Sequence, residues 1–304
     1  MIRPVNFRMN EQTAVNNFYQ KSLAHLSADE IQAQALKEFD NLVEELKSKG
    51  VNVIVVADKA ISNTPDSIFP NNWISFHDNG DVGLYPMFAP NRRLERREDI
   101  LNILEEKGFL IENVIDYSSA ETDEIFLEGT GSIVLDREHQ NAYCALSPRA
   151  EEELFIEFCE DFDYNPIVFS AYQTVDEKRE KIYHTNVMIS IGKSFAIVCL
   201  DAIDDSKERK NLIRHLKESG KEIIGITEKQ VSQFTGNMLQ VKGGNNKPYI
   251  VMSEKAYQSL NHQQINQLEK HGEIIYSDVS TIETCGGGSV RCMMAEIFLP
   301  KHLD

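Results

Sequence analysis

Five residues whose side chains could take part in catalysis recur at nearly constant spacing along the sequence. They are Asn72 in FPNNW, Glu128 in LEGTG, His184 in YHTN, Asn237 in TGNM and Cys292 in GGGSVRC. Successive members are 56, 56, 53 and 55 residues apart, and each stands in a polar turn ahead of a β-rich run. A thiol, an imidazole and a carboxylate are the groups of nucleophilic catalysis, provided that the fold brings them together.

Cys292 is the candidate nucleophile. It follows Gly286-Gly287-Gly288, a backbone that can approach a ligand closely. It also follows Arg291; a nearby cation favours the thiolate, but successive side chains along a strand point apart. His184 and Glu128, at equivalent positions of other repeats, are the expected partners. Asn237 has the weakest case of the five, because Gly-Asn is also a common turn pair.

The elements around these positions repeat in one order: strand, polar turn, strand, helix, strand. Four such units are predicted, each about 55 residues long. Their segments are 73–77, 82–88, 91–107 and 113–118; 132–136, 142–146, 148–160 and 166–170; 187–191, 195–200, 205–219 and 222–226; and 238–241, 248–253, 254–271 and 273–277.

A fifth unit can be assembled from the two ends of the chain. It takes strands at 293–299 and 2–8, a helix over 28–48 and a strand at 51–57. A ring closed by its own termini leaves few sheet edges exposed, so we predict one α/β domain over 1–304 with pseudo-fivefold repeats. The alternative is an open α/β sheet whose units have similar lengths by accident.

Composition excludes several classes of protein. The chain has 304 residues with 31 Lys+Arg against 48 Asp+Glu, a net charge of −17, which argues against nucleic-acid or anionic-membrane binding. No apolar run approaches the roughly 18–20 residues of a membrane span. Five cysteines without a CxxC pair, and a start without the apolar stretch of a signal peptide, favour a reducing, cytoplasmic location. A homodimer is left open.

The motifs together resemble the guanidino-group-modifying enzymes, a superfamily with arginine deiminases, dimethylarginine hydrolases, agmatine deiminases, amidinotransferases and succinylarginine dihydrolases. The segments RPVNFRMNEQTAVNN, FPNNWISFH and LYPMFAPNRRLERR are most similar to the arginine-deiminase-related branch called citrulline-utilization hydrolases. The resemblance covers essentially the whole chain and implies the pentein fold, a five-bladed α/β propeller.

The resemblance implies roles for the three reactive residues. Cys292 matches the nucleophile that attacks the central guanidino carbon, and His184 matches the general acid/base. Glu128 matches the acidic residue that binds the nitrogens of the substrate and helps to orient the site.

It also implies three ligands for the rest of the substrate. Asp66 in PDSIF matches a substrate-binding Asp, and Arg93 in APNRRLERR and Arg149 in LSPRA match arginines that hold an α-carboxylate. The guanidinium fork suits that task because it pairs with a carboxylate through two bonds. By sequence alone, residues 92–97 would be the exposed basic start of a helix and Arg149 a helix residue.

Asn72 departs from the deiminase pattern, in which many relatives carry Asp. A carboxylate only accepts hydrogen bonds, whereas an amide donates as well as accepts and could face the oxygen of a neutral ureido group. The succinylarginine dihydrolases, which process a ureido intermediate, are similar in carrying Asn in this region. We therefore expect a substrate that has a ureido group or passes through one.

The sequence thus predicts a cysteine-dependent hydrolase for C–N bonds of a small guanidino or ureido substrate, with a covalent S-linked intermediate. An amidinotransferase, which passes that intermediate to an amine, and a non-catalytic binder of arginine-like metabolites are the alternatives. No metal or other cofactor is expected, because the chain has no HExxH spacing and no GxGxxG or P-loop that opens a helix.

Overall fold

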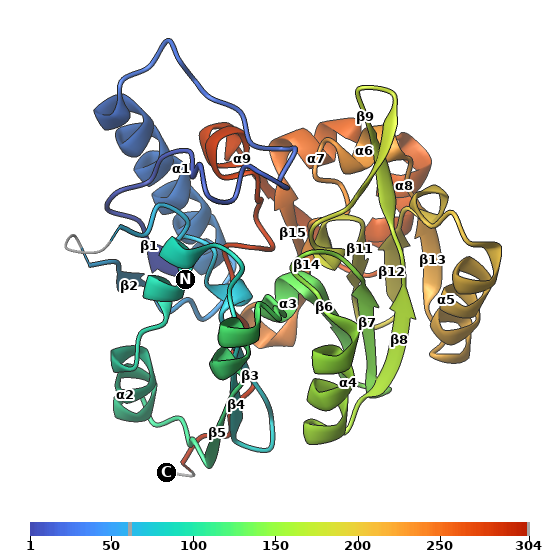
Figure 1. The fold of residues 1–304 in the computed structure, drawn as a ribbon, viewed down its shortest axis with the longest axis horizontal. Coiled ribbons are helices and arrows are strands. Elements are labelled where there is room, and N and C mark those ends of the chain that lie inside the picture. The colour runs from blue at the N-terminus through green and yellow to red at the C-terminus, as the bar shows by residue number, and fades with distance from the viewer. Residues whose placement is uncertain (60–62, 303–304) are drawn as a thin grey trace.

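Four three-stranded sheets of the same construction make up most of the fold (Figure 1). The computed structural model describes residues 1–59 and 63–302. In each sheet the first two strands are antiparallel, and the third runs parallel to the second after a helical connection. The predicted order of strand, turn, strand, helix and strand is therefore confirmed in all four units.

The elements of these units follow the predicted segments closely. The first unit contains β3 Ile74–Phe76, β4 Asp81–Leu84, α2 Asp99–Glu106 and β5 Asn113–Asp116. The second contains α3 Gly129–Ser132, β6 Ile133–Asp136, β7 Asn141–Ala145, α4 Glu152–Asp161 and β8 Asn165–Phe169. The third contains β11 Ile189–Ile191, β12 Phe195–Val198, α5 Ser206–Glu218 and β13 Glu222–Gly225. The fourth contains β14 Leu239–Lys242, β15 Pro248–Ser253, α7 Glu254–Ser259, α8 His262–Glu269 and β16 Glu273–Ser277.

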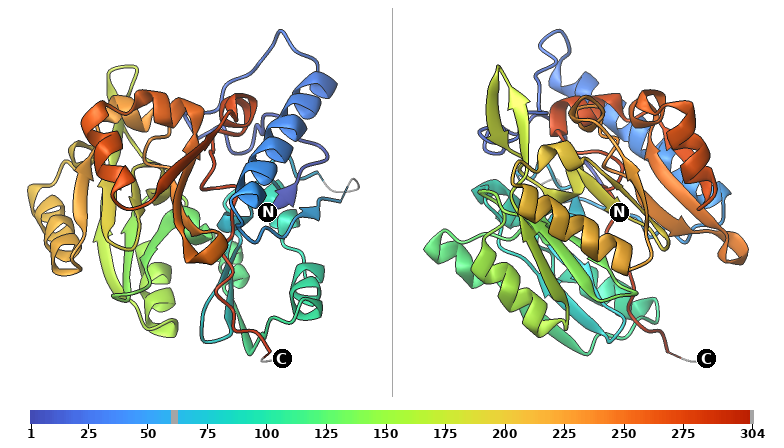
Figure 2. Two further views of the ribbon diagram at one scale, coloured as in Figure 1. Left: turned by 180° about the vertical axis from the view of Figure 1, so that it is seen from behind. Right: turned by 90° about the vertical axis from the view of Figure 1, so that its right-hand side faces the viewer.

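Helices lie on the periphery of the molecule and the sheets lie toward its middle (Figures 1 and 2). The longest helix, α1 Ala28–Ser48, shows why: its buried residues, among them Ala35, Phe39, Leu42 and Leu46, recur at helical spacing. This apolar face packs on β16 and on α9 Ser280–Gly286. Helix α9 in turn leads into the glycine-rich segment before Cys292.

The fifth unit differs from the prediction. Its only ladder joins β1 Ile2–Arg3 to β2 Val56–Ala57 in parallel, and within the described residues 293–299 form no strand. A cavity of about 400 Å³ is lined by residues of both segments, 51–54 and 294–297. The segment after 299 is instead bonded to the first unit: Leu110 N donates to Pro300 O at 2.8 Å. Closure of the ring into a continuous propeller stays a prediction.

Several elements were not expected, and α3 and α9 are among them. The hairpin of β9 Tyr172–Val175 and β10 Lys178–Lys181 projects from the second unit, and α6 Glu228–Val231 precedes the fourth. None of the helices in the described residues has the length and apolar content needed to cross a membrane.

Candidate active site

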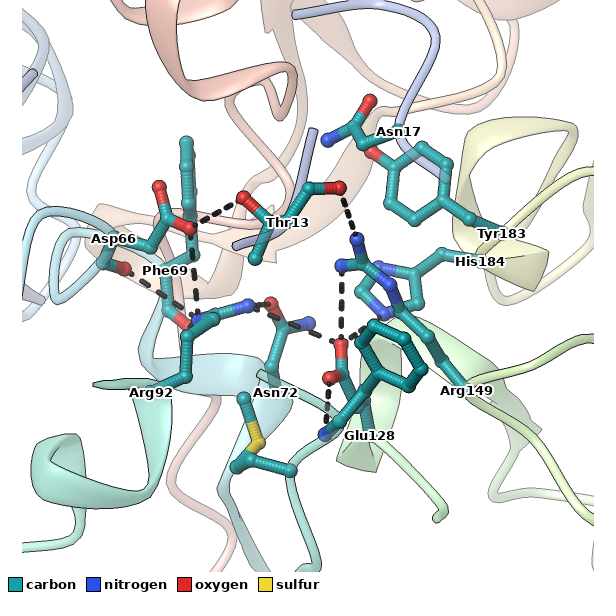
Figure 3. A network of polar contacts seen from close by, with 12 residues as sticks. Thr13, Asn17, Asp66, Phe69, Asn72, Arg92, Glu128, Arg149, Tyr183 and His184 are labelled. Atoms are coloured by element: carbon teal, nitrogen blue, oxygen red, sulfur yellow. Dashed lines mark hydrogen bonds and ion pairs between the residues drawn. The ribbon is translucent and has the colours of Figure 1, made fainter. Parts of the chain in front are cut away.

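A small cavity brings together residues that lie far apart in the sequence. Its lining includes five of the residues named from the sequence: Asp66, Asn72, Arg149, His184 and Cys292. Residues 13 and 17 of the N-terminal segment also line it. Figure 3 shows how the side chains around it point toward one another from different elements. Three of the five repeat positions therefore line one cavity. The other two, Glu128 and Asn237, are not in its lining but are hydrogen-bonded to His184 and Cys292.

The sulfur of Cys292 lies between two amide donors. Asn237 Nδ2 is 3.2 Å and Asn186 Nδ2 is 3.5 Å from Cys292 Sγ, and all three residues are buried. An N–H group directed at sulfur stabilises a thiolate more than a neutral thiol. Sequence reasoning named Asn237 but missed Asn186, which stands two residues after His184 in the same YHTN motif. Its signal was a polar residue at the end of the YHTN motif, directly ahead of the run VMISI.

His184 and Glu128 form the central polar pair of the site. His184 Nε2 donates to Glu128 Oε2 at 2.7 Å, and both side chains are buried. Burial lowers the pKa of His184 to about 4, although the neighbouring carboxylate opposes the shift. The imidazole is therefore neutral at pH 7, and since Nε2 carries the proton, Nδ1 is free to accept one.

Glu128 is ionised although it is inaccessible to water. Burial alone would raise the pKa of Glu128, but Arg149, His184 and Arg92 together hold it well below its usual range. Arg149 Nη1 is 3.4 Å and Arg92 Nη1 is 3.9 Å from Glu128 Oε2, and Phe88 N donates to Oε1 at 3.0 Å. The negative charge needed beside an imidazolium is thus already in place.

Glycines after Glu128 allow the turn of α3 to enter the site. Gly129 has φ +46°, and a Cβ there would lie 2.4 Å from Asn71 O. At Gly131 a Cβ would lie 2.3 Å from Asn72 Nδ2 and 2.9 Å from His184 Nδ1. The glycines of LEGTG therefore let Asn72 and His184 approach the same point.

Arg92 determines which way the Asn72 amide faces. Its guanidinium is buried, donates to both carboxylate oxygens of Glu95 and donates through Nη1 to Asn72 Oδ1 at 2.7 Å. A guanidinium has only donors, so the oxygen of Asn72 must face Arg92. Asn72 Nδ2 then points to the centre of the cluster (Figure 3), and it has no hydrogen-bond partner among the described residues.

Asp66 contributes one oxygen that is likewise free. Its Oδ2 accepts hydrogen bonds from Asn10 Nδ2 at 2.7 Å and Thr13 Oγ1 at 3.1 Å, whereas Oδ1 has no partner within residues 1–59 and 63–302. Burial raises the pKa of Asp66, and the charge of Arg92 opposes that shift. A buried carboxylate oxygen of this kind can receive a cationic group of a ligand.

Arg149 lies at the cavity, but the N-terminal segment occupies its donors. Nη2 donates to Thr13 O at 2.9 Å, and Nε donates to Asn16 Oδ1 at 2.9 Å. The cavity measures only about 10 Å³, room for about one water molecule. The cavity in this structure is therefore smaller than an amino acid, and Thr13 and Asn16 occupy donors of the Arg149 fork.

Arg93 lies outside the cavity, contrary to expectation. Its Nε donates to Met87 O at 3.0 Å, and its side chain is 31% exposed beside Glu121. The reason is local: residues 90–95 form a short 3₁₀ helix, in which neighbouring side chains point in different directions, and it is Arg92 that faces inward.

The described residues hold no cluster of three or more His, Cys, Asp or Glu side chains that could bind a metal ion. The chemistry available is that of a thiol with two amide donors, a neutral imidazole backed by a carboxylate, and an unsatisfied amide N–H. This set suits attack by sulfur on a planar carbon that bears nitrogens.

Comparison with solved structures identifies similar folds. The apo structure of ArgZ, an arginine dihydrolase from the ornithine-ammonia cycle in cyanobacteria, superposes with a TM-score of 0.73 at 18% identity. The match covers 99% of this chain but 40% of the ArgZ chain, so this chain spans less than half of that protein. The substrate-bound N-terminal domain of ArgZ, a cysteine-to-serine mutant, matches with a TM-score of 0.69 at 17% identity and 98% coverage of both chains. A dimethylarginine dimethylaminohydrolase adduct gives 0.61 at 16% identity, covering 86% of this chain and 90% of the other.

These neighbours are pentein enzymes, so the α/β repeat seen here is the repeat of that fold. No curated protein sequence matches the chain. The family described as N,N dimethylarginine dimethylhydrolase, eukaryotic, matches residues 3–299, which includes every residue of the cavity. With that match over nearly the whole chain, this protein belongs to the dimethylarginine dimethylhydrolase family of the guanidino-modifying pentein superfamily.

Proposed function

We propose that this protein is a cysteine-dependent hydrolase that cleaves a guanidino C–N bond and then the ureido group that remains. The substrate class is an arginine-like amino acid. The similar proteins support the first reaction, cleavage of the guanidino C–N bond, because they modify arginine-type compounds. One ArgZ structure holds a covalently bound reaction intermediate. That structure is of an asparagine-to-serine variant of ArgZ.

The orientation of Asn72 is the observation that supports the second reaction, cleavage of the ureido group. Arg92 occupies its oxygen, so Asn72 offers the cavity an N–H donor without a partner. A guanidinium carries only N–H groups and gains nothing from a donor, whereas the oxygen of a ureido group accepts one. As the oxygen becomes negative during attack by sulfur, the same N–H group stabilises it further.

The first cleavage uses Cys292, His184 and Glu128. The thiol proton passes to His184 Nδ1, and the thiolate, supported by Asn186 and Asn237, adds to the guanidino carbon. The imidazolium, stabilised by Glu128, returns the proton to the departing nitrogen, and ammonia leaves. Water, deprotonated by the same imidazole, then displaces the sulfur. One water is consumed and one ammonia released, giving a ureido compound and the free thiol.

The second cleavage repeats these steps on the ureido carbon. Sulfur adds to that carbon while Asn72 Nδ2 donates to its oxygen, and a second ammonia departs with the proton of His184. Hydrolysis of the resulting thiocarbamate gives a carbamic acid, which breaks down to carbon dioxide and the amine. The balance is one water in, with ammonia, carbon dioxide and the amine out.

The two ends of an amino acid suit Asp66 and Arg149. The free Oδ1 of Asp66 would receive an α-ammonium group, and the Arg149 fork would receive the α-carboxylate once Thr13 and Asn16 withdraw. Arg93 is not part of this proposal, because its guanidinium faces Met87 and Glu121.

An assay of ammonia and amine release tests the proposal. The wild-type enzyme should release two ammonia molecules for each guanidino substrate consumed and should also act on the ureido compound. Asn72→Asp removes the donor, so it should release only one ammonia and accumulate the ureido product, with second-step kcat/KM lowered ~100-fold. Asn41→Asp makes the same change on the exposed face of α1 and should behave as the wild type.

Several results would overturn parts of the proposal. Turnover by Cys292→Ala at the wild-type rate would refute covalent catalysis. Consumption of substrate that requires an added amine would instead indicate an amidinotransferase. If the wild-type enzyme stops after one ammonia, Asn72 does not serve a ureido step.

A further inference from the structure

Glu283 is a buried acid that the proposed mechanism does not use. It stands on α9, one turn before the glycines that precede Cys292, and its side chain is 1% exposed. Ser289 Oγ donates to Glu283 Oε1 at 2.6 Å, and Gly287 N donates to the carbonyl oxygen of Glu283 at 2.9 Å. Both ends of the Gly287–Ser289 segment are therefore attached to one residue.

Ser289 connects Glu283 to the nucleophile. Cys292 N donates to Ser289 O at 2.9 Å, which forms the turn that carries the sulfur. Ser289 is completely buried, so its hydroxyl has no water to replace Glu283 if that contact is lost. The position of Cys292 thus depends on a chain of two hydrogen bonds that begins at the Glu283 carboxyl.

We propose that Glu283 is a positioning residue for Cys292: through Ser289 its carboxyl holds the turn that directs the sulfur toward the cavity. The inference rests on the proposed role of Cys292 as the nucleophile. Glu283 itself touches neither the cavity nor the substrate.

The surroundings of Glu283 favour the uncharged form. Ser289 donates to Oε1, whereas Oε2 has no hydrogen-bond partner among the described residues, and Ser253 lies nearby. Lys255 of α7 is the nearby cation and Glu38 of α1 the nearby anion. Burial raises the pKa of Glu283 to about 7, although the two serines and Lys255 oppose the shift and Glu38 adds to it. The carboxyl is therefore protonated below pH 7 and ionises just above it.

Ionisation has a predictable effect on the turn. A carboxylate buried at this position is costly unless it is solvated, and loosening of the Gly287–Ser289 segment would admit water to it. Because the pKa is raised in the folded state, the stability due to neutral Glu283 is complete below the unfolded pKa and is lost as the pH rises through about 7. The Cys292 sulfur should therefore be held less firmly toward the cavity as the pH rises through the same range.

A chloroacetamidine probe tests this without knowledge of the substrate. Cys292 sulfur displaces chloride from the probe, the thiol proton passes to His184, and peptide mapping by mass spectrometry reports labelling at Cys292. At pH 6, Glu283→Ala and Ser289→Ala should lower the labelling rate ~10-fold, because the turn loses its anchor. Glu283→Gln keeps an uncharged acceptor for Ser289 and should restore most of the rate.

The pH profile separates positioning from general stability. The ratio of the Glu283→Gln rate to the wild-type rate should be constant below pH 6 and rise several-fold above pH 7. Glu38→Gln is the matched control: it alters a buried acid that accepts from Thr281 N and Ile282 N at the start of α9, away from the turn. It should lower the unfolding temperature and keep the pH dependence of labelling. The midpoint should move to lower pH, because the anion that helps to raise the pKa of Glu283 is gone.

Two outcomes would overturn the inference. One is labelling of folded Glu283→Ala and Ser289→Ala at the wild-type rate; the other is a pH-independent ratio for Glu283→Gln. If Cys292 is labelled as expected but no guanidino or ureido compound is turned over, the proposed function fails while the positioning role stands.

Discussion

At the scale of single residues, one carboxylate organises the site. Glu128 Oε2 receives the His184 N–H at 2.7 Å and lies within 4 Å of the Arg149 and Arg92 guanidinium groups. Removing a charge from water is costly unless the charge is paired and hydrogen-bonded, and here both conditions are met. The anion is therefore fixed before any substrate arrives, and it can stabilise the imidazolium without rearrangement.

A substitution at Gly131 tests how tightly this centre is packed. In Gly131→Ala the new Cβ would lie 2.3 Å from Asn72 Nδ2 and 2.9 Å from the His184 ring, so both side chains must shift. We expect kcat to fall ~100-fold while the protein remains folded. Steady-state kinetics and circular dichroism measure the two effects.

Gly225→Ala is the matched control for Gly131→Ala. It adds the same methyl group in β13, where no atom lies within 4 Å of the added Cβ. Its kinetics should equal those of the wild type. Full activity in Gly131→Ala would mean that Asn72 and His184 are not held in the observed positions.

At the scale of elements, short turns deliver the reactive groups and longer helices hold the turns. Residues 70–72 and 185–187 form single 3₁₀ turns ahead of β3 and β11, and α3 has four residues. Such turns have few internal hydrogen bonds, so their geometry depends on packing. The nucleophile turn follows α9, which rests on α1, so α1 contributes to the site only through support.

The N-cap of α1 allows a test of whether this helix only supports the site. Ser27 accepts from Glu30 N, and Glu30 Oε2 accepts from Ser27 N at 2.8 Å, which is a capping box. Ser27→Ala should lower the free energy of unfolding by about 1 kcal/mol in urea titrations. Because α1 does not reach the cavity, kcat should be unchanged.

Ser48→Ala, at the other end of the same helix, is the control. Within the described part of the chain its exposed hydroxyl donates only to Glu45 O, so the expected change in the free energy of unfolding is below about 0.5 kcal/mol. A fall in kcat for Ser27→Ala that exceeds the loss of folded protein would show that α1 does more than support α9.

At the scale of the whole molecule, the dominant electrostatic feature is a net charge of −17. Most ion pairs between exposed side chains, such as Arg214 with Glu218, contribute little to stability. The unpaired excess of negative charge repels itself more strongly in the folded state, where the charges are closer together.

Salt should therefore stabilise this protein at neutral pH. Raising the ionic strength from ~20 to ~200 mM shortens the screening length several-fold and should raise Tm by a few degrees. Scanning calorimetry at pH 7 measures the shift. The same experiment near pH 5, where the carboxylates and basic groups nearly balance, is the control and should show almost none. A Tm that falls with salt at pH 7 would mean that ion pairs outweigh the repulsion.

The sequence was a good guide wherever the information is local. Strands such as β12 and β15 and helices such as α1 and α5 follow from runs of apolar residues, their period and the turns between them. The β9–β10 hairpin was missed because Asp176 and Glu177 take positive φ values of 45° and 67° without the glycine or asparagine that usually marks such a turn. The predicted strand at 293–299 does not form. Strand pairing depends on a partner elsewhere in the chain, which the local pattern of residues does not reveal.

For the site, spacing by itself determined the convergence of Cys292, His184 and Glu128, since equivalent positions of a repeat come to equivalent places in space. Only the tertiary structure decided that Arg92 and not Arg93 faces inward, that Asn186 reaches the sulfur and that Asn72 presents its nitrogen. The physical reason is that a repeat specifies where a backbone position lies, whereas the direction of a side chain is set by the partners that other elements bring to it.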